Sequence, residues 1–171
     1  MDYFLLKQSG TVTIPKAPKT EASTSADTSG AQEPSVRVME HVGVLGKFDY
    51  IAREHLVSDR LKQLLELYLP GFAWRPCVFI DPPRKEQQTF WFLPALPYLP
   101  RRVVTASNGM PAAIFISEQD FARKAPGVLR IRSPKGTVFF LVHLSVAESI
   151  LRRGICGLEL EKLSSGEATA F

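Results

Sequence analysis

Two stretches of the chain repeat apolar residues at the spacing that places them on one face of a helix. The apolar positions are Leu61, Leu64, Leu65 and Tyr68 in the first stretch, and Leu144, Ala147, Ile150 and Leu151 in the second. Ser58 or Asp59 can cap the first helix, because their side-chain oxygens accept an exposed backbone N–H. Pro70-Gly71 and Gly154 end the two helices. The pattern therefore predicts two amphipathic helices.

Shorter apolar or alternating runs predict the strands. They cover residues 3–6, 36–39, 73–80, 89–93, 113–116, 128–132, 137–142 and 158–161. The turns at 81–86 and 133–136 predict two antiparallel hairpins. Prolines make 95–101 irregular, and 118–124 reads as a helical turn capped by Ser117. We therefore expect an α+β fold, in which a mixed, mainly antiparallel sheet packs against the two helices.

A polar segment separates the first strand from the rest of the chain. Residues 15–35 contain no Val, Ile, Leu, Met, Phe, Trp, Tyr or Cys. Such a segment cannot bury enough apolar surface to offset the entropy cost of ordering it. We expect an N-terminal strand in 1–14, a flexible linker or disordered loop in 15–35, an α+β domain in 36–163 and a frayed tail in 164–171.

The sequence contains one internal echo. Leu56-Val57-Ser58 and Leu141-Val142-His143 each lead into a helix that ends at a glycine and is followed by a strand. His143 thus occupies the position of Ser58, which favours a role at a helix cap over a catalytic role. The echo indicates either a duplication or a common supersecondary pattern.

The composition is that of a globular protein that folds without a metal or a disulfide. The chain has 171 residues, of which 45% are hydrophobic and 22% charged, and no apolar run approaches the roughly 20 residues of a membrane helix. The N-terminus lacks the basic and apolar regions of a signal peptide, so we expect a cytoplasmic protein. Cys77 and Cys156 have no CxxC partner; buried free thiols are favoured over a disulfide or a reactive cysteine.

The positive charge is local. Residues 101–171 hold 10 basic and 6 acidic residues, an excess equal to the net charge of +4 of the whole chain. The segment from Arg123 to Lys135 contains five basic residues and no acidic one. It is either a solvated face or a patch that attracts nucleic acid or an acidic protein. No zinc finger or RNA-binding aromatic motif accompanies it, which disfavours nucleic acid as a partner.

No catalytic motif is present. The three histidines, His41, His55 and His143, lack the spacing of metal ligands, and the chain contains no nucleophile elbow or phosphate-binding glycine loop. We therefore predict no catalytic residue, no metal site and no cofactor. The aromatic run 90–92 favours a binding surface instead, because Trp91 faces away from Phe90 and Phe92 on a strand. Trp91 is either an exposed anchor or packed under residues 94–100.

Four stretches resemble a family of small bacterial immunity proteins that belong to polymorphic toxin systems, the Myxococcus-type immunity domain. They are MDYFLLK, LVSDRLKQLLELYLPGFAWRPCVFI, TFWFLPAL and IFISEQDFARKAPGVLRIRSPKGTVFFLVHLSVAESILRRGICGLELEKL. The family has an "IF-S" strand, a "-FR-" strand, an apolar strand running into a helix and a "G--G--F/L" ending, which match residues 114–117, 129–132, 139–142 and 154–160. The chain departs from the family in 15–35 and at His143, where the family often has Ser.

The resemblance implies a non-enzymatic cytoplasmic protein that binds a cognate toxin domain encoded by an adjacent gene and occludes its active site. Such toxins are often nucleases or other enzymes delivered by type VI secretion or contact-dependent systems. Because a charge of +4 disfavours mimicry of nucleic acid, we expect an interface of aromatic and local charged residues. Its members are Asp81, Arg84, Glu86, Trp91, Glu118 and Asp120. The alternative is a small nucleic-acid-binding or regulatory domain that uses residues 123–135. The oligomeric state stays open.

Overall fold

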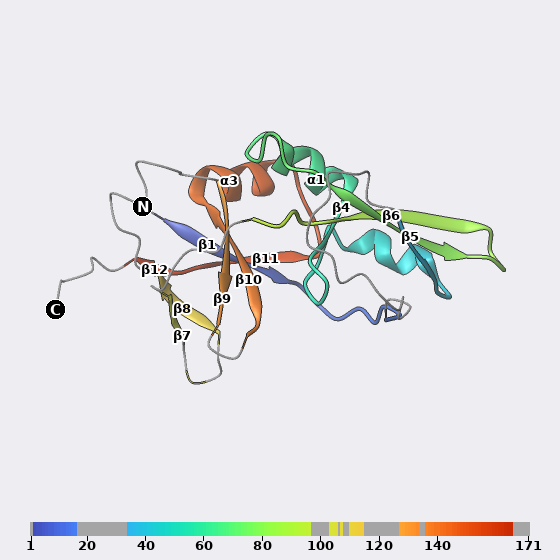
Figure 1. Cartoon of the computed structure of the whole chain (residues 1–171), viewed down its shortest axis with the longest axis horizontal. Helices are drawn as coiled ribbons and strands as arrows, with labels where there is room; N and C mark the ends of the chain where they lie inside the picture. Colours follow the sequence, from blue (N-terminus) through green and yellow to red (C-terminus); the bar gives the residue numbers. More distant parts are fainter. Residues whose placement is uncertain are drawn as a thin grey trace, which may run out of the picture.

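The computed structural model of the chain describes residues 2–16, 34–96, 103–105, 107, 110–114, 127–133 and 136–165. Within these ranges the chain forms two α-helices, one 3-10 helix and three sheets (Figure 1). The α+β class is confirmed, and most neighbouring strands are antiparallel. The strands are divided among separate sheets instead of forming one.

The first sheet has four antiparallel strands in the order β11-β1-β10-β9. They are β1 (Tyr3–Gln8), β9 (Val128–Arg132), β10 (Val138–His143) and β11 (Leu158–Lys162). The predicted N-terminal strand and the predicted β9–β10 hairpin are therefore both present.

The second sheet has five strands in the order β2-β5-β6-β4-β3, with β2 and β5 parallel and the other neighbours antiparallel. They are β2 (Ser35–Val38), β3 (Tyr50–Ile51), β4 (Leu56–Ser58), β5 (Arg75–Asp81) and β6 (Glu86–Phe92). A small third sheet, in the order β12-β8-β7, is made of β7 (Val103–Thr105), β8 (Pro111–Ile114) and β12 (Ser164–Ser165).

Both predicted helices begin at the expected caps. The Ser58 Oγ accepts the N–H of Leu61 at 3.3 Å at the start of α1 (Asp59–Glu66). The His143 Nδ1 accepts the N–H of Ser145 at 3.3 Å at the start of α3 (Leu144–Arg152). His143 therefore has the capping role that its position predicts. A 3-10 helix, η1 (Val42–Lys47), follows β2.

The internal echo corresponds to a repeat of architecture. The units β3-β4-α1-β5 and β9-β10-α3-β11 each contain a hairpin, a helix and a strand, and each sheet places one antiparallel strand, β6 or β1, between the last two strands. The N–H groups of the two cap residues also make equivalent backbone hydrogen bonds. Ser58 N donates to Asp49 O at 2.9 Å and His143 N donates to Gly127 O at 2.8 Å, just before the first strand of each unit. The Leu-Val echo thus marks equivalent positions in two split β-α-β units.

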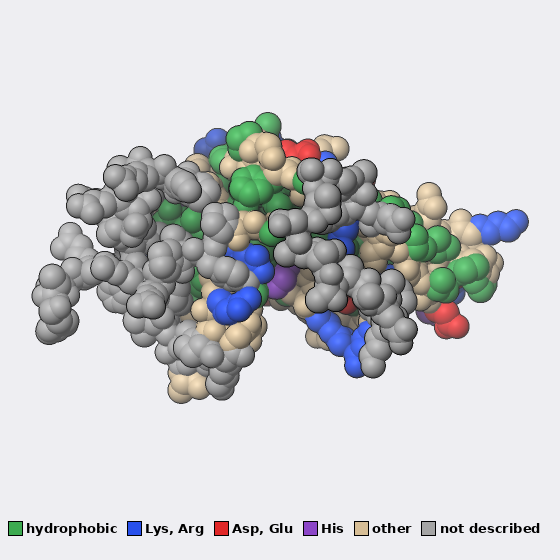
Figure 2. All heavy atoms as spheres, viewed as in Figure 1, with side chains coloured by type: hydrophobic (Ala, Val, Ile, Leu, Met, Phe, Trp, Pro, Cys, Tyr) green, Lys and Arg blue, Asp and Glu red, His purple; other side chains and the backbone are tan. Residues whose placement is uncertain are grey.

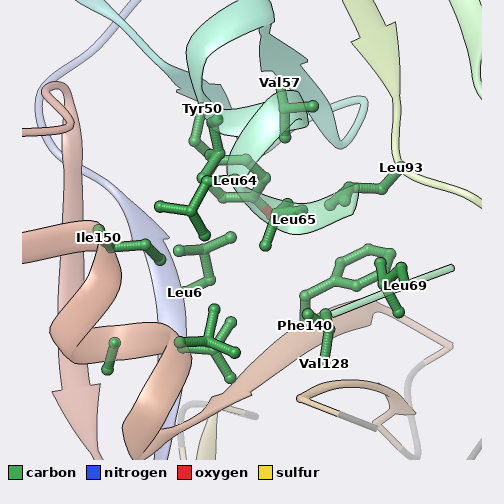
Figure 3. Close-up of a cluster of buried hydrophobic side chains, with 14 of the residues drawn as sticks. Leu6, Tyr50, Val57, Leu64, Leu65, Leu69, Leu93, Val128, Phe140 and Ile150 are labelled. Atoms are coloured by element: carbon green, nitrogen blue, oxygen red, sulfur yellow. The ribbon is translucent and has the colours of Figure 1, made fainter. Parts of the chain in front are cut away.

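The main core lies where the two units meet. Helices α1 and α3 pack beside each other, and leucines of α1 meet Leu6 and Phe140 of the four-stranded sheet, Tyr50 of the five-stranded sheet and Ile150 of α3 (Figure 3). Fully burying one such side chain contributes about 1.5–3 kcal/mol. This core holds the five-stranded sheet in a fixed orientation against the four-stranded one.

A buried carboxylate ties the units together. Asp49 is 6% exposed, and its carboxylate accepts the Ser58 hydroxyl and the backbone N–H of Cys156, the latter at 2.6 Å. The Arg60 guanidinium lies 3.8 Å from the same carboxylate. Asp49 therefore links the cap of α1 to the segment that precedes β11.

Some expectations need correction and others fall outside the described residues. Cys77 is buried and free as expected, but Cys156 is exposed, because it lies in the loop between α3 and β11. Residues 164–165 form β12, which pairs with β8, so the tail does not fray from residue 164. The expected loop (through residues 17–33), the helical turn at 118–124 and residues 166–171 lie outside the described residues.

Candidate functional site

The two faces of the five-stranded sheet are covered to different extents. One face carries Cys77, Phe79 and Phe90, which are fully buried in a cluster with η1 and Ile14. Within the described residues, the other face is covered by α1 only at the end formed by β3, β4 and the last residues of β6. The hairpin β5–β6 continues beyond α1 and projects from the body (Figure 1). The uncovered part of this face is the candidate site.

Trp91 lies where the cover of α1 ends. Its indole N–H donates to the Asp59 carboxylate, and the Lys62 ammonium lies 4.6 Å from its ring centroid. Trp91 is half-buried and on the opposite face from Phe90, as the alternation predicts. Part of its cover comes from α1, whereas residues 97–100 of the predicted cover lie outside the described residues. The indole N–H and part of the ring are therefore engaged within the chain.

Beyond Trp91 the same face carries a set of uncharged side chains that we call the valine face. Its members are Val36, Val38, Val78, Ile80, Gln87 and Thr89. Val36 is 48% exposed and Val38 is 64% exposed, and none of the four apolar members belongs to a buried cluster of the described residues. Figure 2 shows hydrophobic side chains at this projecting end, with basic side chains at its tip. Exposed apolar surface of this kind marks interaction sites.

The turn of the hairpin brings three of the predicted interface residues together, and one of them has a different role. Asp81 is 2% exposed, and its carboxylate accepts the N–H of His41 at 2.8 Å and of Arg84 at 3.4 Å. Asp81 therefore holds the turn and the end of β2 through its bonds to backbone N–H groups. Its contact with a toxin stays a prediction.

Arg84 and Glu86 are exposed at the same tip. Glu86 pairs with Asp81 across the hairpin and lies towards η1, since a Cβ built on Gly43 would be 3.5 Å from its Oε2. Glu86 is therefore on the face opposite to the valine face. Glu118 and Asp120 lie outside the described residues.

The basic segment is described in part. Arg130 and Arg132 lie on β9, the first half-buried and the second exposed, whereas Arg123, Lys124 and Lys135 are outside the described residues. These two arginines share one face of an edge strand. Their role in binding nucleic acid stays a prediction.

One charged residue of β2 points inward. Arg37 lies between Val36 and Val38, is 3% exposed and forms an ion pair with Glu54. Burial alone would lower the pKa of its guanidinium, but the hydrogen bond that Arg37 donates to Glu54 and neighbouring negative charge raise that pKa on balance. The only charge of this strand is therefore neutralised inside the sheet, and the side chains that face solvent are valines.

His55 is the most perturbed histidine of the described residues. Burial, with a smaller contribution from the positive charge of Arg130, lowers its pKa to about 4. Its Nδ1 lies 3.2 Å from the Tyr50 hydroxyl, and its ring contacts Phe140 edge-on at 4.9 Å between centroids. The neutral imidazole of His55 thus packs between the five-stranded sheet and the four-stranded sheet. No group of three metal-ligating side chains occurs within the described ranges.

The chain matches no protein-family model, no curated protein sequence and no solved structure. Neither α1 nor α3 is long and apolar enough to cross a bilayer, and the described residues contain no other helix that is. The valine face was missed in the sequence because β5 reads as apolar on both faces. Its signal is the V-R-V pattern of β2, in which valines occupy the positions opposite to a buried charge.

Proposed function

We propose that this chain is an immunity protein that acts in the cytoplasm by binding a cognate toxin domain, and that it binds through the valine face. The observation that carries the proposal is an uncharged, partly exposed sheet face on β2 and a hairpin that projects from a well-packed body. Soluble proteins rarely leave such a surface without a partner. The resemblance to immunity proteins supports a toxin as that partner.

Binding alone is sufficient for this function, because a protein seated over an active site excludes the substrate. The rigid core supports such a mode, since the hairpin is anchored through Phe79 and Phe90 and does not have to be ordered on binding. The local character of the positive charge argues against simple mimicry of nucleic acid. An apolar patch with a charged rim is the common composition of a protein interface.

The test is co-expression of the chain with the toxin domain encoded by the adjacent gene. We expect growth to be restored and the two proteins to purify as a stable complex. Gln87→Arg places a charge on the valine face and is expected to weaken the complex at least tenfold, because an unpaired charge would be buried at the contact. Failure of both growth rescue and co-purification would overturn the proposed function.

The matched control is Glu86→Arg, the neighbouring exposed position on the opposite face of β6. This variant is expected to bind as the wild type does. Equal losses in the two variants would show that the contact surrounds the hairpin tip, which would overturn the assignment to the valine face and favour the predicted role of Glu86. Neither side chain is buried, so both variants should fold.

A further inference from the structure

The two split β-α-β units meet through a turn of the five-stranded sheet as well as through their helices. Residues 52–55 connect β3 to β4, and the last of them, His55, contacts Phe140 of the four-stranded sheet. We propose that His55 is a pH-sensitive switch between the two sheets: its neutral ring holds this turn against the four-stranded sheet, and protonation of the ring releases the turn. Such a switch acts within the fold and goes beyond the proposed function.

The backbone holds His55 in a defined position between the sheets. Its φ of 55° lies in the left-handed region, which among residues with a side chain Asn, Asp and His adopt most readily. Its N–H donates to Ala52 O at 3.3 Å, and its C=O accepts the N–H of Leu93 at 2.9 Å. Gln8 of the four-stranded sheet accepts the N–H of Ala52 through its Oε1 at 3.0 Å. The contact between the ring and Phe140 is therefore coupled to the position of the whole turn.

The ring of His55 lies between one buried aromatic residue from each sheet. The hydroxyl of Tyr50 on β3 shares a hydrogen bond with its Nδ1, and Phe140 on β10 meets the ring edge-on. A neutral imidazole suits this position, because it packs against Phe140 as an aromatic ring and still satisfies the hydroxyl. A protonated ring would carry a full charge into the contact between the sheets, where water cannot solvate it well.

The charge that faces the ring from the four-stranded sheet is positive. Arg130 lies opposite Phe140 in the ladder between β9 and β10, and therefore on the same face of the sheet. Burial is the main cause that lowers the pKa of His55, and the charge of Arg130 acts in the same direction. On β3, burial raises the pKa of the Tyr50 hydroxyl, which stays neutral. Protonation is thus opposed from both sheets.

The remaining described neighbours of the turn do not compensate a charge on the ring. Gln8 and Leu93, which bond to the turn from β1 and from the end of β6, are uncharged. Within the turn itself, Glu54 is engaged in the ion pair with Arg37, and Arg53 is exposed. The described surroundings therefore favour the neutral ring.

The direction of the pH dependence follows from the lowered pKa. An imidazole in an unfolded chain has a pKa of about 6.5, whereas the pKa of His55 in the folded chain is about 4. The released turn consequently binds a proton more tightly than the packed turn does. The stability that the neutral ring contributes is fully present above the unfolded pKa and is lost as the pH falls from there towards the folded pKa.

The first test compares His55→Asn with the matched control His41→Asn by urea denaturation at pH 7.5 and pH 5. Both positions have a left-handed backbone, which asparagine tolerates, and His41 is exposed. Between the two pH values, the wild type and His41→Asn should lose about thirtyfold more of their folding equilibrium constant than His55→Asn does. Each protein is compared with itself, so packing lost in a variant does not affect the result.

Hydrogen exchange distinguishes release of the turn from a uniform loss of stability. The backbone N–H groups of Ala52 and Leu93 are bonded at the turn. Their protection, relative to the exchange rate of an unstructured chain at the same pH, should fall between pH 7.5 and pH 5 by more than the protection of amides in β10. This additional decrease should be absent in His55→Asn.

An NMR titration of the wild type tests the ring directly and needs no variant. The His55 signal should titrate below about pH 5, and Arg130→Gln should raise the midpoint because it removes the positive charge that faces the ring. An ordinary midpoint near 6.5 would overturn the proposal. So would an equal pH dependence of stability in His55→Asn and the wild type, or an equal loss of protection in the turn and in β10.

Discussion

Strands β11 and β2 are outer edges of two sheets that share an arrangement of four strands, to which β2 is a fifth, and they distribute charge in opposite ways. On β11 the alternate residues Glu159 and Glu161 are exposed, and Lys7 pairs with Glu161 at the surface. On β2 the charge of Arg37 is buried with Glu54, and valines face the solvent. One edge is thus protected by charge, whereas the other carries exposed valines and has no further strand among the described residues.

The difference follows from what each unit adds to the common arrangement. In the first unit β5 and β6 are seven residues long and extend past α1, and β2 is added beside β5. In the second unit β11 has five residues and β1 has six. The longer hairpin therefore creates a sheet surface that the helix does not reach. Equivalent topology can thus close one unit and leave an exposed sheet face on the other.

The largest loss of stability is expected when Arg37, the buried charged residue of β2, loses its ion-pair partner Glu54. Glu54→Gln leaves the Arg37 guanidinium buried without a counter-ion, and should lower the free energy of unfolding by about 3 kcal/mol. The matched change on the protected edge, Glu161→Gln, breaks the exposed pair with Lys7 and should cost about 1 kcal/mol or less. Urea denaturation of the two variants gives both values.

A double variant tests whether the cost of Glu54→Gln comes from the unpaired buried charge of Arg37 or from the loss of the Glu54 carboxylate itself. Arg37→Met combined with Glu54→Gln removes both charges and should recover most of the stability, because no buried charge remains. Equal costs for Glu54→Gln and Glu161→Gln would contradict the contrast between the two edges.

Much of the fold could be predicted because its signals are local. The helical spacing of Leu61, Leu64 and Leu65 and the cap at Ser58 specify α1, and the turn at 81–86 specifies the hairpin. The division into separate sheets could not be predicted, since β1 pairs with strands more than 130 residues away. Pairing over such distances depends on tertiary packing, which leaves no local pattern.

The candidate site was predicted less well because exposure depends on what covers a strand. Asp81 is an ordinary turn residue in the sequence, and only the position of His41 shows that its carboxylate is buried on backbone donors. Val78 alternates with Phe79 on a strand that is apolar on both faces. Which face stays open is decided by the length of α1 relative to the hairpin.

A smaller effect is expected at the end of β2, which Asp81 holds in place. Asp81→Ala removes the acceptor for the backbone N–H groups of His41 and Arg84, and should lower the free energy of unfolding by about 2 kcal/mol, the loss of two hydrogen bonds to a charged acceptor. Glu86→Ala, across the hairpin, should change stability by less than about 0.5 kcal/mol because its side chain is exposed. Equal unfolding midpoints for the two variants would show that Asp81 does not anchor the strand.

The smallest loss of stability is expected when a helix cap is removed. The two caps occupy equivalent positions in the two units and can therefore be compared. Ser58→Ala removes both the cap of α1 and the hydroxyl that donates to buried Asp49, and should cost about 1–2 kcal/mol. His143→Ala removes only a side chain that accepts from Ser145 at the start of α3, and should cost about 0.5 kcal/mol, the lower end for a cap. Thermal unfolding monitored by circular dichroism measures both variants under one condition. If the order of the two costs is reversed, the Asp49 linkage is not what distinguishes the units, and their difference is confined to the edge strands.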